Sequence, residues 1–339
     1  MSAPRRVVVR GPNWLGDLVM AGPAIRSLGD DWPEATVHVA VPAAFAPVVT
    51  MLDPRAAAVP LHRRRGPAAV RGHAAQLRDG GYDVAILLTN SFGSALAMRL
   101  AGVPERWGYR RDGRGLLLTR GIGARDVRRE SRHHADDYAA LIEALGLTRP
   151  ALEMRARLPG TARDEAEALL HVEGWDGVTP LLACAPGAAY GTAKQWPPRH
   201  VAVVATHWIG QGGRVVIVGA EGDRPAAAAV LAALPAASRP AAIDLTARTS
   251  LLALAGVLGL ASRVLANDSG AMHLASALGT PTVAVFGPTR EWATAPLGPH
   301  RILTHEVWCR PCMLRECPLD HRCVTGVSPQ RVVDALGQL

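Results

Sequence analysis

Short apolar runs alternate with helical patterns along this chain of 339 residues. In the first half the strand-like runs lie at 7–10, 37–41 and 84–88, and the helical patterns lie at about 18–29, at 68–78 and from about Ser94. Such alternation is typical of a parallel sheet with helices on its faces. The apolar runs lack a period of two, which indicates strands that are buried on both sides.

The same alternation restarts in the second half. A helix expected at 136–146 ends the first half. In the second half, strands are expected at 181–185, 214–218, 263–267 and 282–286, and helices at 199–210, 224–234 and 271–278. The polar stretch 155–161 contains Pro159 and Gly160 and resembles a link between domains. We therefore predict an α/β protein with two Rossmann-like, doubly wound parallel-sheet domains facing across a cleft. They span 1–155 and 156–327, followed by a packing helix at 328–339.

Composition narrows the class of protein. With 49% hydrophobic and 19% charged residues, the chain has the balance of a globular protein. Aromatic residues make up 4%, which is few for stacking on bases, so we expect no nucleic-acid partner. No apolar run approaches the roughly 18 to 20 residues that span a bilayer, and Arg5-Arg6 leads directly into a strand-like run. A cytoplasmic protein is therefore expected.

Lys194 is the only lysine among the 37 Lys and Arg residues. A bias towards arginine should spare a lysine where a compact ammonium on a flexible stem is needed, and phosphate binding is one such place. Gly187 and Gly191 belong to the same loop, which follows the strand at 181–185. The alternative is a lysine retained on the surface without a role.

The arginines concentrate in the first half of the chain. Ten of them lie between Arg99 and Arg132 against four acidic residues, and residues 63–65 form a second cluster. Such clusters fit an anionic partner, which could be RNA, anionic lipid or a phosphorylated substrate. They equally fit a solvated face without a partner.

Asp17 ends a loop that follows the first strand, just before the helical pattern at 18–29. At the start of a helix, an aspartate caps the backbone and is favoured by the helix dipole. A carboxylate at a strand end can also act as a general base for an attacking hydroxyl. Spacing alone leaves both roles open.

The strongest local pattern follows the strand at 263–267 and opens the next helix. Asp268 or Ser269 is placed to cap this helix, and Gly270 lets a ligand approach the backbone amides, which attract phosphate. His273 falls one turn along the helix. The alternative is an ordinary capped helix with a core histidine.

A third loop follows the strand at 214–218 and carries Glu221, where a carboxylate can accept hydrogen bonds from ribose hydroxyls. The three loops together predict a nucleotide diphosphate site in the second half of the chain.

Three phrases resemble those of the bacterial lipopolysaccharide heptosyltransferases of glycosyltransferase family 9, closest to the heptosyltransferase II group. They are residues 11–17 (GPNWLGD), 186–197 (PGAAYGTAKQWP) and 267–275 (NDSGAMHLA). The order of the phrases is the same, and the similarity extends over nearly the whole chain. Residues 90–95 and 108–110 also resemble stretches of the acceptor half of that family.

The resemblance implies a GT-B glycosyltransferase that moves heptose from ADP-heptose to the heptosyl-Kdo2-lipid A inner core in lipopolysaccharide biosynthesis. It implies transfer with inversion and without a metal ion, and an enzyme at the cytoplasmic face of the inner membrane. Asp17 is then the catalytic base. The implied donor-binding residues are Asn13, Lys194, Glu221, Asp268, Ser269, Gly270 and His273. The first-half arginines would meet Kdo carboxylates, lipid A phosphates and the anionic membrane surface.

Four cysteines crowd the C-terminal region, at Cys309, Cys312, Cys317 and Cys323. Their ligand type suits a structural zinc ion or an iron–sulfur cluster, but the spacing after the first pair is shorter than in ordinary zinc ribbons. Free thiols and a reversible disulfide are equally open. Related transferases often lack these cysteines, so the resemblance gives them no part in the reaction.

Other functions remain open at this level. The nearest alternatives are heptosyltransferase I and another GT-B nucleotide-sugar enzyme, such as an epimerase or a transferase for a different sugar. A more distant alternative is a non-catalytic protein that binds RNA through the arginines or senses redox state through the cysteines.

Overall fold

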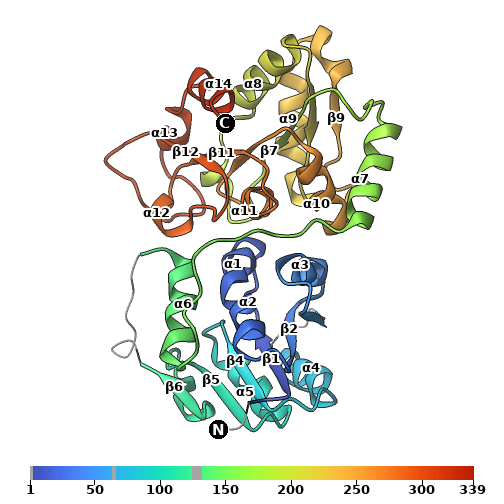
Figure 1. Cartoon of the computed structure of the whole chain (residues 1–339). Helices are drawn as coiled ribbons and strands as arrows, with labels where there is room; N and C mark the ends of the chain where they lie inside the picture. Colours follow the sequence, from blue (N-terminus) through green and yellow to red (C-terminus); the bar gives the residue numbers. More distant parts are fainter. Residues whose placement is uncertain (1–2, 63–65, 124–131) are drawn as a thin grey trace. The chain divides into compact units, whose positions relative to one another are not determined.

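Two parallel β-sheets of six strands each organise the chain (Figure 1). The computed structural model describes residues 3–62, 66–123 and 132–339. The chain divides into two units, Met1–Arg157 and Leu158–Leu339, and the division falls within the polar stretch 155–161. Each unit has its own sheet and its own core. These two parallel sheets confirm the predicted α/β class.

The sheet of the first unit has the strand order β3-β2-β1-β4-β5-β6. Its strands are β1 (Arg6–Arg10), β2 (Thr36–Pro42), β3 (Ala57–Leu61), β4 (Val84–Leu87), β5 (Glu105–Tyr109) and β6 (Arg120–Ile122). Val8 at the centre of β1 pairs with His38 on one side and with Ala85 on the other. The chain reverses its direction of winding between β1 and β4, as in doubly wound folds.

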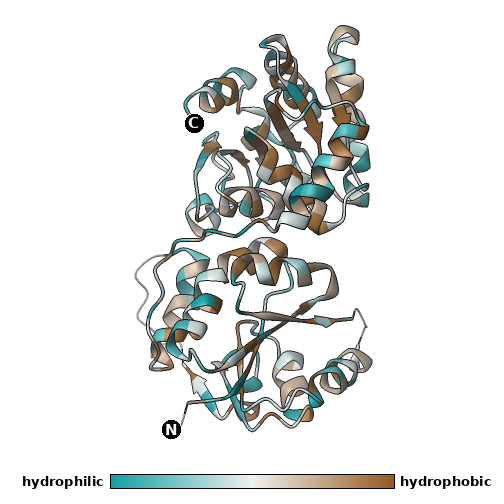
Figure 2. Ribbon diagram, turned by 45° about the vertical axis from the view of Figure 1, so that its right-hand side comes forward, coloured by the Kyte–Doolittle hydropathy of each residue, from teal (hydrophilic) through white to brown (hydrophobic). Residues whose placement is uncertain are grey.

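Helices cover both faces of this sheet. One face carries α4 (Pro67–Arg78), α5 (Phe92–Leu100) and the 3-10 turn η2 (Arg114–Leu117). The other carries α1 (Leu15–Met20), α2 (Gly22–Asp31), α3 (Ala46–Leu52) and α6 (His134–Ala144). Several central strands are coloured as hydrophobic in Figure 2, and Val7–Val9 of β1 and all four residues of β4 are buried. Burying both faces of the strands explains why their sequences lack alternation.

One predicted helix is divided in two. The sequence indicated a single helix over 18–29, whereas the structure has α1 and α2, separated at Ala21. Pro23 lies in the first turn of α2, where it lacks the N–H that a continuous helix would use. The proline thus starts a new helix.

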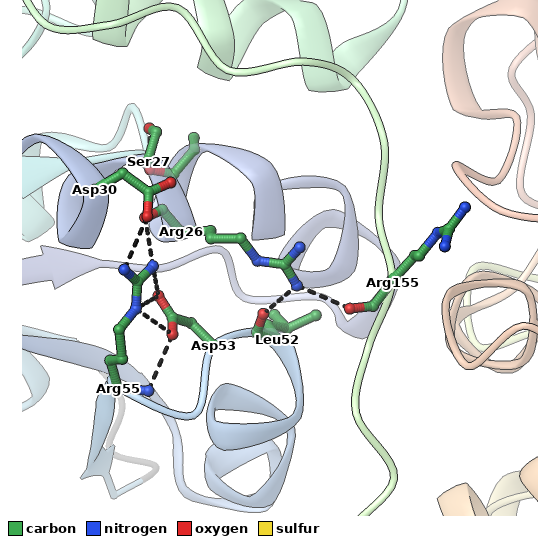
Figure 3. A network of polar contacts seen from close by, with 8 residues as sticks. Arg26, Ser27, Asp30, Leu52, Asp53, Arg55 and Arg155 are labelled. Atoms are coloured by element: carbon green, nitrogen blue, oxygen red, sulfur yellow. Dashed lines mark hydrogen bonds and ion pairs between the residues drawn. The ribbon is translucent and has the colours of Figure 1, made fainter.

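A network of polar contacts ties the end of the first unit to α2 and α3 (Figure 3). Arg26 Nη2 donates to the carbonyl oxygens of Leu52 and Arg155, at 2.9 and 2.8 Å. Arg55 forms ion pairs with Asp53 and Asp30 beside it. The Arg26 side chain, 129 residues earlier in the sequence, therefore fixes residue 155 to the first unit through the Arg155 carbonyl oxygen.

The second unit repeats the architecture with the strand order β12-β11-β10-β7-β8-β9. Its strands are β7 (Leu181–Ala185), β8 (Arg214–Ile217), β9 (Ala242–Asp244), β10 (Arg263–Asn267), β11 (Thr282–Phe286) and β12 (His300–Thr304). Leu265 of β10 pairs with Val283 and with Cys184. The winding reverses between β7 and β10.

The helices of the second unit form two layers. α8 (Pro198–Gly210), α9 (Arg224–Ala233), α13 (Arg322–Thr325) and α14 (Pro329–Gly337) share one core cluster with the sheet. α7 (Gly160–Val172) packs on α10 (Leu251–Leu260) so closely that a Cβ at Gly256 would lie 2.0 Å from the Ala162 carbonyl oxygen. The short α12 (Glu291–Thr294) follows β11, and α11 (Gly270–Ala277) follows β10.

The C-terminal helix is present as expected. Ser328 caps α14 through its side chain, Pro329 occupies the first turn, and Val332 and Leu336 are buried in the core. No helix within the described ranges is both long enough and apolar enough to span a bilayer.

Candidate functional site

The loops of interest in the second unit follow strands that flank the reversal point of the sheet. β7 and β10 are neighbours, and the loop 186–197 follows β7 while residues 268–269 follow β10. Because parallel strands end at one edge of a sheet, these loops lie next to each other. This edge is where doubly wound folds bind their ligands.

Lys194 and Asp268 form the centre of this site. Lys194 Nζ lies 2.6 Å from Asp268 Oδ2, and the two side chains are 12% and 6% exposed. Thr289 Oγ1 donates to the same carboxylate oxygen at 2.6 Å. The lysine therefore lies at the predicted place, and its charge is balanced by a buried carboxylate.

Asn267 holds the two loops together. Its Oδ1 accepts a hydrogen bond from the Trp196 backbone N–H at 3.0 Å, and its Nδ2 donates to the Pro186 carbonyl oxygen at 2.7 Å. Asn267 lies within the phrase 267–275 but was not predicted as a site residue, and no pattern in the sequence indicated Thr289. Thr289 follows β11, the next strand along the sheet, so only the strand order reveals it.

The start of α11 differs from the predicted cap. Ser269 occupies the N-cap position, but its side chain makes no capping hydrogen bond, and Asp268 binds Lys194 instead. Ser269 Oγ is buried and has no hydrogen-bond partner among the described residues. His273 is buried in the first turns of the helix. An unused hydroxyl beside free backbone amides is the chemistry that an anion requires.

Glu221 lies on the surface of its loop. Its side chain is 77% exposed and pairs with Arg224 at 2.7 Å. Asp223 is the carboxylate that packs against the β7 loop, because a Cβ at Gly187 would lie 2.0 Å from Asp223 Oδ1. Asp223 Oδ2 also accepts from the Ala220 N–H. Asp223 was not predicted as a site residue, although it lies in the same loop after β8 as Glu221.

In the first unit, Asp17 lies in the first turn of α1 and is half-buried. Burial raises the pKa of Tyr138 on α6 above its ordinary value, and the charges of Asp17 and Asp137 raise it further. Asp17 is therefore close enough to that phenol to affect its ionisation.

Asn13 lies in the same loop as Asp17 and is exposed. Its Oδ1 accepts a hydrogen bond from Arg10 Nη2. Burial lowers the pKa of Arg10 to about 10. A buried arginine at the end of β1 thus positions the loop that contains Asn13.

Arg114 is a second buried arginine of this unit. It is completely buried, and burial lowers its pKa to about 10. Its guanidinium donates to the carbonyl oxygens of Tyr109, the last residue of β5, and Thr89, which follows β4, and to Asn90 Oδ1. Arg114 thus connects residues 108–110 with the start of residues 90–95, the two stretches that the resemblance assigns to acceptor binding.

The arginine clusters are described in part. Arg63, Arg64, Arg65, Arg125, Arg128 and Arg129 lie outside the described residues. Arg110 and Arg111 line a hollow of about 470 Å³ together with Leu116, which is 93% exposed. Arg120 lies over the Trp107 ring, 5.2 Å from its centroid. Arg110 and Arg111 are exposed and Arg120 is half-buried, whereas Arg114 of the same cluster is fully buried. The exposed arginines are consistent with either interpretation of the cluster.

The four C-terminal cysteines line one small cavity. The cavity walls include all four of these side chains together with Ala193 and Pro288, and each cysteine is a free thiol. Burial raises the pKa of Cys323, and the neighbouring Cys309, Cys312 and Cys317 raise it further. Over the described ranges, no group of three or more His, Cys, Asp or Glu side chains is arranged to hold a metal ion. The four thiols thus line one cavity, but they are not arranged as the ligands of a metal ion.

Comparison with known families gives a match over most of the chain. A family model described as glycosyltransferase family 9 (heptosyltransferase) matches residues 70–322. Lipopolysaccharide heptosyltransferase 2 of Escherichia coli strain K12 is 31% identical over 351 residues, with 98% of each chain covered.

Solved structures agree with this match. The structure of E. coli ADP-heptose lipopolysaccharide heptosyltransferase II superposes with a TM-score of 0.82 and 28% identity, covering 98% of each chain. A glycosyltransferase family 9 structure from Veillonella parvula gives a TM-score of 0.85 at 20% identity, covering 100% of this chain and 98% of the other. At 20% identity, the similarity to the V. parvula structure shows a shared fold.

Proposed function

The chain belongs to glycosyltransferase family 9, the heptosyltransferases, and from this premise we propose that it transfers heptose from ADP-heptose to the heptosyl-Kdo2-lipid A inner core of lipopolysaccharide. The names of its relatives support the donor and the second heptose position. The second unit, which contains the Lys194 loop, is proposed as the donor-binding domain. The first is proposed as the acceptor-binding domain.

The observation that carries this proposal is the group formed by Lys194, Asp268 and the start of α11. Lys194 Nζ is held at 2.6 Å from Asp268, and the buried Ser269 hydroxyl lacks a partner among the described residues. A diphosphate could accept hydrogen bonds from the ammonium, the hydroxyl and the helix amides at once. Gly270 keeps the approach to the backbone open, and His273 lies one turn further along.

We propose a single displacement for the transfer. The acceptor hydroxyl oxygen attacks the anomeric carbon of the heptose as the bond to the ADP oxygen breaks, which inverts the configuration. Asp17 accepts the hydroxyl proton, and the bonding electrons leave with ADP. Lys194 and the α11 amides stabilise the charge that develops on the diphosphate, a role that a divalent cation fulfils in other transferases. We propose that transfer takes place without a metal ion, because these cationic and amide groups can take over part of the role of a divalent cation.

Asn13 and Glu221 have weaker support as donor ligands. Asn13 is already bonded to Arg10, and Glu221 is exposed and paired with Arg224. Each would have to exchange a partner on binding, Glu221 for a ribose hydroxyl. Both nevertheless lie in loops at strand ends, where a donor would be bound.

The surface arginines of the first unit are proposed to meet the acceptor and the membrane on which it lies. Arg110 and Arg111 are exposed beside the exposed Leu116. Cationic side chains near an apolar one suit carboxylates and phosphates at an anionic bilayer surface. We accordingly propose peripheral contact with the cytoplasmic face of the inner membrane.

A structural zinc ion or iron–sulfur cluster at Cys309, Cys312, Cys317 and Cys323 is proposed separately from catalysis. The shared cavity and the mutual effect on the Cys323 pKa support it. Binding would have to draw the thiols closer than they lie in this structure. Metal analysis of protein purified under anaerobic conditions tests the proposal, because a metal-free protein that is folded and as stable as the metal-treated protein would contradict it.

The function itself is tested by incubation with ADP-heptose and purified acceptors, followed by mass spectrometry. We expect one heptose to be added to heptosyl-Kdo2-lipid A and none to Kdo2-lipid A. Transfer to Kdo2-lipid A alone would instead identify the first heptose position. Transfer from UDP-sugars but not from ADP-heptose would overturn the proposed donor.

A further inference from the structure

The segment between Cys312 and Cys317 packs directly against the Lys194 loop. The Ala193 N–H donates to the Arg315 carbonyl oxygen at 3.0 Å, and the Tyr190 hydroxyl donates to the Met313 carbonyl oxygen at 2.6 Å. A Cβ at Gly191 would lie 2.2 Å from the Arg315 carbonyl oxygen. Two segments more than a hundred residues apart in the sequence are therefore in main-chain contact beside the site.

This contact brings a second cation to the Tyr190 ring. Lys194 Nζ lies 4.6 Å from the ring centroid, and Arg315 Cζ lies 5.2 Å from the same centroid. Each charge is attracted to the ring. This attraction offsets part of the mutual repulsion of two cations that lie near the same ring.

The two cations differ in how their charge is compensated. Lys194 is paired with Asp268, so the pair carries no net charge. Arg315 is exposed and forms no ion pair within the part of the chain that the structure describes. Arg310, which precedes this segment, is 4% exposed and bound to both Glu291 and Glu306. Arg315 is thus the cation of this segment that is available for a ligand.

We infer that Arg315 is a donor-binding residue whose guanidinium binds the diphosphate of the nucleotide sugar. The inference rests on the proposed function and adds a residue to its donor site. A diphosphate needs more positive charge than the neutral Lys194–Asp268 pair supplies. A guanidinium presents its donors in a fork that matches two phosphate oxygens.

The backbone geometry explains how an exposed side chain is kept in place. The carbonyl groups of Met313 and Arg315 are fixed by residues 190 and 193, while the Arg315 side chain extends over the ring. The arginine can therefore turn towards a ligand without disturbing the loop. The four cysteines lie on either side of this segment, so their chemical state would affect where Arg315 is held.

Calorimetry with ADP tests the inference on the full-length protein. Arg315→Ala should weaken ADP binding by about tenfold, and Arg315→Lys should restore part of the loss, because an ammonium keeps the charge but not the fork. Arg301→Ala is the matched control, since Arg301 is an exposed arginine on the edge strand β12 of the same unit. It should leave ADP affinity unchanged.

Steady-state kinetics show whether Arg315 affects the binding of ADP-heptose or that of the phosphate-bearing lipid acceptor. Arg315→Ala should raise the KM for ADP-heptose and leave the KM for the lipid acceptor unchanged. ADP affinity equal to that of the wild type, or a rise confined to the acceptor KM, would overturn the inference while leaving the proposed function intact. A wild-type protein that transfers no heptose and binds no ADP would instead remove the proposed function.

A second variant covers the case in which Arg315→Ala perturbs the fold. Tyr190→Phe keeps the ring beneath both cations but removes the hydrogen bond to Met313. Tyr190→Leu removes the ring as well. ADP affinity should fall further in Tyr190→Leu than in Tyr190→Phe, and equal affinities in the two variants would contradict the shared-ring arrangement.

Discussion

Lys194 Nζ lies 2.6 Å from Asp268 Oδ2, although 74 residues separate them in the sequence. Lys194 follows β7 and Asp268 follows β10, and these strands are neighbours at the reversal point of the second sheet. Thr289, after β11, completes the group. The adjacent ends of three strands thus form one polar site.

Lys194→Ala should weaken the binding of ADP by about 10- to 100-fold, the equivalent of one charge-assisted hydrogen bond of about 1.5–3 kcal/mol. Lys194→Arg should recover little of this affinity, because a planar guanidinium replaces a compact ammonium. Isothermal titration calorimetry measures both. Wild-type affinity in Lys194→Ala would mean that the only lysine of the chain has no part in donor binding.

Asp268→Ala should destabilise the second unit, because it leaves a largely buried ammonium without its carboxylate. Breaking a buried pair in this way costs about 3–5 kcal/mol. Adding Lys194→Met to Asp268→Ala should restore part of the loss, since neither charge then remains. Denaturant unfolding of the two single variants and the double variant measures the coupling, and strictly additive losses would show that the two side chains do not interact.

Asp17→Asn should lower kcat by about 10²- to 10⁴-fold, because an amide cannot accept the acceptor proton. Binding of ADP should be nearly unchanged. Asp137→Asn is the matched control, since both carboxylates raise the pKa of Tyr138 but only Asp17 is proposed as the base. If both variants lost activity to the same extent, the effect would belong to the surroundings of Tyr138 and not to a base at position 17.

Gly187→Ala should disturb the donor loop, because the added Cβ would lie 2.0 Å from Asp223 Oδ1. We expect a lower melting temperature and weaker binding of ADP. Gly222→Ala is the control in the neighbouring loop, since no atom lies within 4 Å of a Cβ there. Thermal unfolding and ADP titration compare the two, and an equal response would show that Asp223 moves aside without consequence.

Two histidines should make the free energy of unfolding depend on pH. Burial lowers the pKa of His38, with a smaller effect of Arg6, and burial lowers that of His200, with a smaller effect of Arg199. Both take up protons more readily when the chain is unfolded. The free energy of unfolding should therefore fall as the pH drops through about 6.5, the ordinary value, and continue to fall down to the folded-state pKa.

Urea unfolding between pH 8 and pH 5 measures this dependence. Replacing both residues, in His38→Asn with His200→Asn, should flatten the curve in that window. A curve of the same slope in the double variant would assign the acid sensitivity to other groups.

The sequence by itself determined the class of fold and indicated the loops in which we propose the donor site. The central strands β1, β4, β7, β10 and β11 are continuous apolar runs, because they are buried on both faces, and that pattern is visible without a structure. The loops after β7 and β10 could be predicted as neighbours from the topology of doubly wound sheets. Lys194 and Asp268 follow from that rule.

Tertiary structure decided what depends on contacts between distant segments. The outer strands β6 and β9 are three residues long, β12 is partly polar and β3 contains a proline, so their sequences do not distinguish them from loops. Glu221 and Asp223 are two residues apart, and only packing against Gly187 shows which one faces the β7 loop. Arg315 acquires its position from a ring and a main chain more than a hundred residues away. Periodicity is a local property of a sequence, whereas these relationships arise only when the sheet brings its loops together.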